Sequence, residues 1–282
     1  MNDLAVLALV GSLFWFAGIG CGNSDDGVSY VKNDGSYCLP EAENRTEDCF
    51  IGGSEELVSV GGDSLEGIEQ ICNSKCNKIK LLSISNAKGL KNLKAFRGIE
   101  VTKYLSIGSN DHLKTTQGLQ ARNGIRLVVN GNRALHSITV LDGLTSVSGV
   151  TIENNPNVSE IVGLGDIDEA KQLVLAGTSL ENLQQLNGLE LGMKSSLAVS
   201  GNPNIQKMPE LSGEARFIEI YNNRLLTDVS GVSGLGKIWG GLGITDNPNL
   251  KNCEAQQLTE DIEFYEDAKI EINKNGSGSC PQ

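Results

Sequence analysis

The sequence predicts an all-β dominated solenoid of about ten turns of about 23 residues, with short helical caps at both ends. Three observations predict it: a strand motif that recurs along the chain, further apolar columns with the same period, and an unusual composition. Aromatic residues make up only 5% of the 282 residues, and 34 residues are glycine, well above the usual share of about 7%. Leu, Ile and Val must therefore fill the core.

The recurring motif is an apolar residue, any residue, a second apolar residue, two further residues and often Asn. Clear copies begin at Leu105, Leu127, Val150, Leu197, Ile218, Leu242 and Ile270, and weaker copies begin at Val58, Leu82 and Leu173. The second apolar residues fall at positions 60, 84, 107, 129, 152, 175, 199, 220, 244 and 272. Each copy fits a short strand whose alternate side chains point inward and outward.

Apolar residues also recur six, nine and twelve positions after the second apolar residue. The +6 column contains Leu90, Leu113, Leu135, Val158, Ile205, Leu226 and Leu250. A single turn cannot bury its apolar side alone, so neighbouring turns are expected to stack and share one core. The Asn column fits a structural role, since Asn tolerates tight bends and can bond buried backbone groups.

Two segments at the ends of the repeats have the apolar spacing of helices. Residues 64–78 begin with a candidate N-cap, Ser64, and residues 253–265 have a similar pattern. Such caps would cover the ends of the stacked turns. Long helices elsewhere are disfavoured by the β-branched strand motifs and the frequent Gly and Asn.

The N-terminal 20 residues are predicted to be a signal peptide, because residues 4–20 form an uncharged apolar run. Cys21 follows the small residues Gly18 and Gly20, and this segment resembles a bacterial lipobox, which implies lipidation of Cys21. Residues 21–37 would then hold the lipidated cysteine and a flexible polar tether. The alternative is an ordinary secretory signal cleaved near Gly18 or Gly20, and Met1–Asp3 contains no Lys or Arg.

Six cysteines remain after Cys21, an even number that suits disulfides in an exported chain. They are Cys38, Cys49, Cys72, Cys76, Cys253 and Cys280. Cys253 and Cys280 are the natural C-terminal pair. The first four allow three connectivities, of which Cys38–Cys49 with Cys72–Cys76 is favoured, so residues 38–55 form a disulfide-bearing N-terminal segment. A zinc site is the less favoured alternative.

Three later repeats share an Asn-Pro-Asn turn after the strand, at 155–157, 202–204 and 247–249. With the stretch from Gly240 to Cys253, these motifs resemble the receptor L domain, the ligand-binding module of insulin- and EGF-receptor ectodomains, which has relatives in bacterial surface proteins. The resemblance covers residues 56–282 with the caps. It implies a right-handed β-helix or leucine-rich-repeat-like fold with disulfide-bonded ends and a ligand-binding role.

Several function classes are disfavoured by the composition. The net charge of −12 and the pI of about 4.7 argue against binding to nucleic acid or to an anionic membrane surface. The chain has two histidines and no catalytic or metal-binding motif. No catalytic residue, metal or cofactor is therefore predicted.

The best candidate binding surface is the outward face of the strands. Its candidate residues are Val128, Thr151, Val174, Ala198, Glu219, Tyr221 and Thr245. A flat sheet with a weakly apolar centre suits docking of a partner, and Tyr221 is the best single hot spot. The alternative is that these β-forming residues only support the strands or lie under another segment.

We therefore expect a non-enzymatic binding or adhesion module that recognises a protein or glycan at the cell surface. It would be exported and anchored at the cell envelope, at the outer membrane or cell surface, by lipid on Cys21. Two alternatives stay open: a structural scaffold of the cell envelope, and a polysaccharide-active β-helix enzyme.

Overall fold

The structure is a computed structural model that describes residues 47–52, 57–62, 67–68, 71, 74–93 and 96–277. The expected signal peptide, Cys21 with its tether, Cys38, Cys72 and Cys280 lie outside these residues. Within the described ranges, no helix is both long enough and apolar enough to cross a bilayer.

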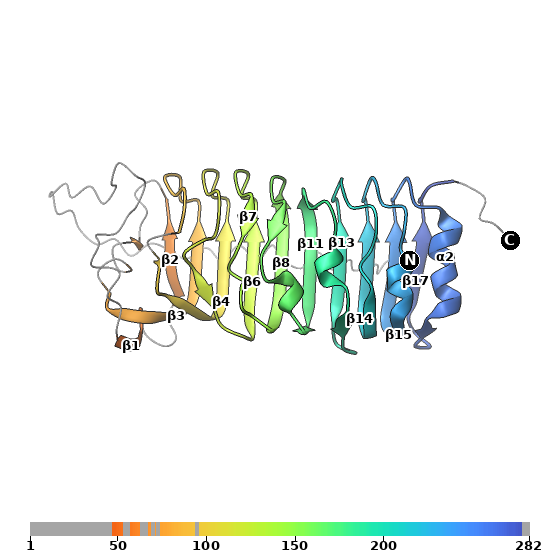
Figure 1. Cartoon of the computed structure of the whole chain (residues 1–282), viewed down its shortest axis with the longest axis horizontal. Coiled ribbons are helices and arrows are strands. Elements are labelled where there is room, and N and C mark those ends of the chain that lie inside the picture. Colours follow the sequence, from red (N-terminus) through yellow and green to blue (C-terminus); the bar gives the residue numbers. More distant parts are fainter. Residues whose placement is uncertain are drawn as a thin grey trace, which may run out of the picture.

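Most strands belong to one parallel sheet of 15 strands. Ten of them stand side by side in chain order along the long axis of the molecule (Figure 1). They are β2 (Leu57–Gly61), β3 (Cys76–Ser85), β4 (Glu100–Gly108), β6 (Ile125–Asn130), β8 (Ser146–Asn155), β11 (Gln172–Thr178), β13 (Ser196–Ser200), β14 (Leu211–Tyr221), β15 (Leu235–Thr245) and β17 (Lys269–Asn273). One such strand with the segment that leads to the next is called a repeat below.

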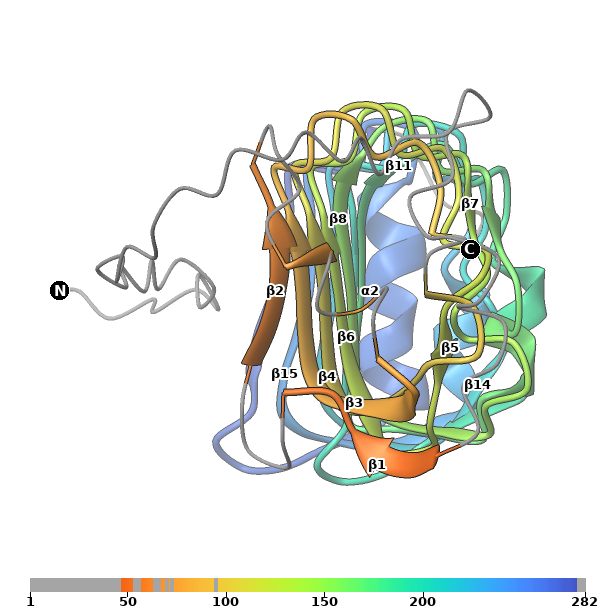
Figure 2. The same ribbon diagram turned by 90° about the vertical axis from the view of Figure 1, so that its left-hand side faces the viewer.

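Shorter elements lie at the lower edge of the sheet and in the return segments that join successive strands. They are β1 (Glu47–Phe50), β5 (Gln120–Ala121), β7 (Ser137–Ile138), β9 (Glu160–Ile161), β10 (Glu169–Ala170), β12 (Leu189–Leu191), β16 (Glu263–Phe264), the 3-10 helices η3 (Leu164–Asp166), η4 (Gln184–Leu186) and η5 (Ser230–Gly234), and α2 (Asn252–Asp261). Figure 2 shows the sheet on one side, the return segments on the other, and α2 closing the far end of the space between them.

The register of the strands follows the sequence repeat. The second apolar residues of the motif pair with one another across all ten strands, from Val60 and Ile84 through to Ile244 and Ile272. The first nine of them are at most 1% exposed, and the +6, +9 and +12 columns are buried as well. The predicted strands, their inward faces and the shared core are confirmed.

A ladder of asparagines, all of them buried except the last, follows the ends of the strands. Its members are Asn110, Asn132, Asn155, Asn202, Asn223, Asn247 and Asn275. Each side-chain Oδ1 accepts the backbone N–H of the residue at the same position one repeat earlier, at 2.9–3.1 Å. Each Nδ2 donates to the carbonyl of the second apolar residue of the preceding repeat, at 2.8–3.0 Å.

The backbone bends sharply just before each ladder position. The preceding residue has a positive φ between 53° and 70° in every repeat from β3 to β17. Asn and Gly tolerate this left-handed conformation best, and they occupy six of these nine positions, including Asn86, Gly131 and Asn222. The turn therefore explains part of the Gly and Asn enrichment of the sequence.

Both predicted caps are shorter than the sequence suggested. The C-terminal helix α2 ends at Asp261, because Glu263 and Phe264 pair with Lys237 and Ile238 of β15. At the other end, Ile68 and Ile71 are helical and buried, but the predicted helix over 64–78 cannot extend beyond residue 75, because β3 begins at Cys76.

The disulfide pairing favoured for the N-terminal cysteines is wrong. Cys49 is bonded to Cys76, with their Cα atoms 4.8 Å apart, which excludes both Cys38–Cys49 and Cys72–Cys76. The reason is that β1 pairs in parallel with the start of β3, placing Cys49 beside Cys76. Cys253 is also disulfide-bonded, while Cys280, its predicted partner, lies outside the described residues.

The asparagine ladder makes the stability sensitive to single substitutions. Asn223→Ala would leave the Asn202 N–H and the Val199 carbonyl buried without their partners. We expect the free energy of unfolding to fall by about 3 kcal/mol, because each orphaned group costs about 1–3 kcal/mol. Urea denaturation followed by circular dichroism measures this change.

The matched control is Asn204→Ala. Asn204 is exposed, and its side chain makes one long hydrogen bond to the Ser179 carbonyl, so a loss below about 1 kcal/mol is expected. Equal losses for the two variants would show that the buried ladder is not a special source of stability.

Candidate binding surface on the strand face

The outward side chains of the sheet form straight rows across the ten strands. The central row runs from Ser59 through Val128, Ala198 and Glu219 to Glu271, with each residue directly paired to the next strand. Since neighbouring strands lie about 4.8 Å apart, side chains in one row cover each other. Even correctly oriented residues can therefore expose little surface.

This packing separates the predicted binding residues into two groups. Val128 and Thr151 point outward by alternation with buried neighbours, yet only 9% and 4% of their surface is exposed. Val174, Ala198, Glu219 and Thr245 are partly exposed, and Tyr221 is 45% exposed. The accessible part of the predicted surface therefore lies toward the C-terminal strands.

Three outward residues of β14 form a stripe across the sheet, hereafter the β14 stripe: Phe217, Glu219 and Tyr221. Ile218 and Ile220, which alternate with them, are fully buried. The sequence pattern indicated Glu219 and Tyr221 but missed Phe217, although the same alternation places Phe217 two residues before Glu219. Two aromatic side chains with a carboxylate between them thus share one strand.

The strands on either side of the β14 stripe contribute small side chains. On β13, Ser196, Ala198 and Ser200 pair with the three stripe residues, and on β15, Gly241, Gly243 and Thr245 do the same. A Cβ atom added to Gly243 would meet nothing within 4 Å. The side chains of the stripe therefore project beyond their smaller neighbours, and a partner can approach them from the side.

The Phe217 ring leans over the glycines of β15. A Cβ atom on Gly240 would lie 2.6 Å from two Phe217 ring carbons, so this position requires glycine. On its own strand, the Arg216 guanidinium lies 5.3 Å from the Phe217 ring centroid, a cation–π distance. These contacts hold the ring in place before any partner arrives.

Glu219 is the electrostatically unusual member of the stripe. Its half-burial raises the pKa of its carboxyl above the usual value, because the charged form loses contact with water. Among the described residues, no side chain or backbone group forms a hydrogen bond or ion pair with its carboxylate. Glu219 can therefore accept a hydrogen bond or pair with a cation supplied by a partner.

A second group of aromatic residues, not identified from the sequence, lies at the lower end of β15. The Trp239 indole N–H donates to a Glu214 carboxylate oxygen at 2.7 Å, and the Tyr265 ring centroid lies 5.6 Å from the Trp239 ring. The Lys237 ammonium sits over Trp239 at 4.8 Å and pairs with Glu263. These polar and aromatic groups have their partners within the cluster. The cluster therefore has a structural role and links β14, β15 and β16.

Among the described residues, no group of three or more His, Cys, Asp and Glu side chains is placed to hold a metal ion. No model of a known protein family matches the chain, and no curated protein matches it. The resemblance to the receptor L domain thus stays a prediction carried by the motifs of this sequence.

The raised pKa of Glu219 predicts a pH-dependent effect on stability. In the folded state this carboxyl binds its proton more tightly than in the unfolded state, so stability falls as the pH rises above about 4.3 toward the folded pKa. We expect Glu219→Gln to be more stable than the parent at pH 7, by at most about 1 kcal/mol because the group is half exposed. The gain should vanish below about pH 4.

Urea denaturation at several pH values tests this expectation, with Glu271→Gln as the matched control at the exposed end of the same row. The control should change little at any pH. A Glu219→Gln variant less stable than the parent at pH 7 would mean that the carboxylate has a favourable partner in the folded protein.

Proposed function

We propose that this chain is an exported, non-enzymatic binding module that recognises a protein or glycan at the cell surface through its strand face. In this proposal the parallel sheet belongs to a solenoid of the right-handed β-helix or leucine-rich-repeat-like kind, related to the receptor L domain. The solenoid would be anchored at the cell envelope by lipid on Cys21. No cofactor is part of the proposal.

The fold part of the proposal is supported by the pairing pattern. Every main strand pairs in parallel with the next along the chain, and the inward row keeps its register from β2 to β17. A chain that returns to the same register once per repeat, always on the neighbouring strand, is what stacked turns with a shared core require.

The binding part rests chiefly on one observation, the β14 stripe. Tyr221 is 45% exposed on a regular sheet, beside a carboxylate without a described partner and between strands of small residues. Tyr is one of the residue types that most often anchor protein interfaces, and a ring above a flat floor also offers a stacking surface for a sugar.

The location part rests on the sequence and on one structural feature. The Cys49–Cys76 disulfide suits an exported chain, because disulfides persist outside the reducing cytosol. Cys21 lies at the end of the apolar N-terminal run, and two or more lipid chains on one residue suffice for stable anchoring.

The strand-face proposal predicts that Tyr221→Ala weakens binding. The probe is envelope fragments prepared from host cells that lack this protein, titrated with the purified chain. We expect at least about a tenfold loss of affinity, as for an aromatic hot spot. Met193→Ala is the control, because Met193 is similarly exposed, at 51%, but lies outside the strands.

Equal affinity of the two variants would exclude Tyr221 as an anchor and favour a structural scaffold role. Depolymerisation of envelope glycan by the parent chain would instead favour the polysaccharide-active enzyme. Circular dichroism of both variants shows whether a loss of affinity reflects a loss of fold.

The proposed anchor has its own test, mass spectrometry of the N-terminal peptide of the mature protein isolated from its host. We expect the mature chain to begin at Cys21 with diacylglycerol on the thiol, because the lipobox-like segment ends there. A mature N-terminus with an unmodified Cys21 would remove the lipid anchor and leave an ordinary secreted protein.

A further inference from the structure

The return segments form the side of the molecule opposite the strand face, which is called the opposite wall below. Short backbone bridges join its successive repeats. Thr115 pairs with Ser137, β7 pairs with β9, and Lys207 pairs with Asp228. Among the described residues, no such bridge joins segment 180–187 to the repeat before it or after it. The backbone ladder of this wall is therefore interrupted at one repeat.

The interruption coincides with two features of this repeat, the second of which, a 3-10 helix, also occurs in two other return segments as η3 and η5. Thr178 occupies the ladder position that is Asn in neighbouring repeats, and residues 184–186 form the 3-10 helix η4. A 3-10 turn directs its N–H and C=O groups along its own axis, so it cannot pair sideways with the extended segment that contains Lys207. The wall opens at this place.

A groove of about 430 Å³ occupies the opening, between segments 181–187 and 206–210. Its floor is apolar, with Leu183 and Met208 each 1% exposed. Its polar lining includes Glu181, Gln206 and Glu210. A second hollow of about 200 Å³, which contains Asp168 and Glu190, continues it and shares Asn187.

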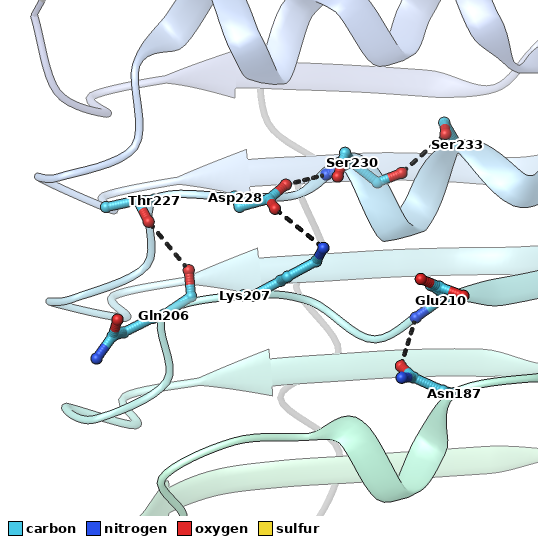
Figure 3. Close-up of polar contacts among 8 residues, drawn as sticks. All are labelled: Asn187, Gln206, Lys207, Glu210, Thr227, Asp228, Ser230 and Ser233. Carbon is cyan, nitrogen blue, oxygen red and sulfur yellow. Dashed lines mark hydrogen bonds and ion pairs between the residues drawn. The ribbon is translucent and has the colours of Figure 1, made fainter.

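Figure 3 shows how the polar groups around this groove are engaged. The Asn187 Oδ1 accepts the Glu210 N–H at 2.9 Å, which fixes one end of the groove. The Lys207 ammonium pairs with the carboxylate of Asp228 in the next repeat, with 3.3 Å between Nζ and Oδ2. The other oxygen of this carboxylate accepts the Ser230 N–H at 2.8 Å. The lysine charge is thus already paired.

The carboxylates of the groove have no such partners. Those of Glu181 and Glu210, and those of Asp168 and Glu190 in the adjoining hollow, form no hydrogen bond or ion pair with any described residue. Among the lining residues only Lys207 is a cation. The groove therefore has an unbalanced negative charge.

Backbone groups of the groove are also available. Asp228 donates its N–H to the Gln206 carbonyl and accepts the Met208 N–H, so in this parallel pairing the N–H and C=O of Lys207 point the other way. That direction is toward the groove, and the Lys207 N–H donates to no described acceptor. The groove thus has an open edge of one residue, Lys207, whose backbone N–H and C=O an extended peptide can pair with.

We propose that this groove binds an extended peptide segment bearing a Lys or Arg side chain. The peptide backbone would pair with the open edge at Lys207, and its cationic side chain would meet Glu181 and Glu210. No aromatic residue lines the groove, so a sugar ring would find no stacking plane. This site is separate from the strand face and does not depend on it.

The test is a titration of the full chain with a fluorescent peptide of four Lys-Thr repeats, followed by fluorescence polarisation. We expect the double variant Glu181→Gln, Glu210→Gln to bind at least about tenfold more weakly than the parent, since two carboxylates of the groove lose their charge. Glu160→Gln is the matched control, because Glu160 is exposed on the same wall outside the groove. It should retain parental affinity.

Since the chain has a net charge of −12, nonspecific attraction must be separated from groove binding. The same peptide with N-methyl groups on alternate amides keeps its charge but loses backbone donors, and we expect it to bind at least about tenfold more weakly. Equal affinity for both peptides, or an equal loss in Glu160→Gln and the double variant, would overturn the proposal.

Two further outcomes would also overturn it: no binding of the Lys-Thr peptide, and groove-dependent binding of a neutral β-1,4-linked glucose tetramer instead. The Tyr221→Ala variant should bind the Lys-Thr peptide as the parent does. Failure of the strand-face proposal and failure of the groove proposal can thus be told apart.

Discussion

The structure depends on satisfying the backbone polar groups that each repeat buries where its strand ends. A strand that turns sharply inside a stack leaves N–H and C=O groups away from water, and each unpaired group costs free energy. The asparagine ladder solves this with one residue type, because an amide side chain both donates and accepts. Asn132, for example, bonds the Asn110 N–H and the Ile107 carbonyl at once. The apolar columns supply the driving force for stacking, but the ladder keeps the repeats in one register.

The close spacing of parallel strands explains why the outward face is flat and why only part of it can act as a contact surface. Branched side chains in one row cover each other, as at Val128 and Thr151, so a partner gains little from the middle of the sheet. The β14 stripe differs because its neighbours are small. Gly240 and Gly241 admit the Phe217 ring, and the open space above Gly243 leaves one side of Glu219 accessible. Glycine here creates a surface feature by leaving space around larger neighbours.

On the opposite wall, a local departure from the repeat opens a groove. In the repeat of Thr178, where η4 begins beside the segment that contains Lys207, the backbone bridges stop and a groove with a polar rim opens. The repeats directly before and after it contain the ladder residues Asn155 and Asn202, and each keeps a backbone bridge to its other neighbour. In an array this regular, the irregular repeat is where polar groups remain available for a ligand.

The sequence by itself determined the period, the inward residues and the ladder, because each depends on positions a fixed number of residues apart. The rows from Val60 to Ile272 and the buried Asn110, Asn155 and Asn247 are all visible as columns. Only the tertiary structure decided the Cys49–Cys76 pairing, the poor exposure of Val128, the orientation of the Phe217 ring over Gly240 and the groove beside Lys207. These depend on which segments lie side by side, and on how neighbouring side chains share the space between strands, which a one-dimensional pattern does not encode.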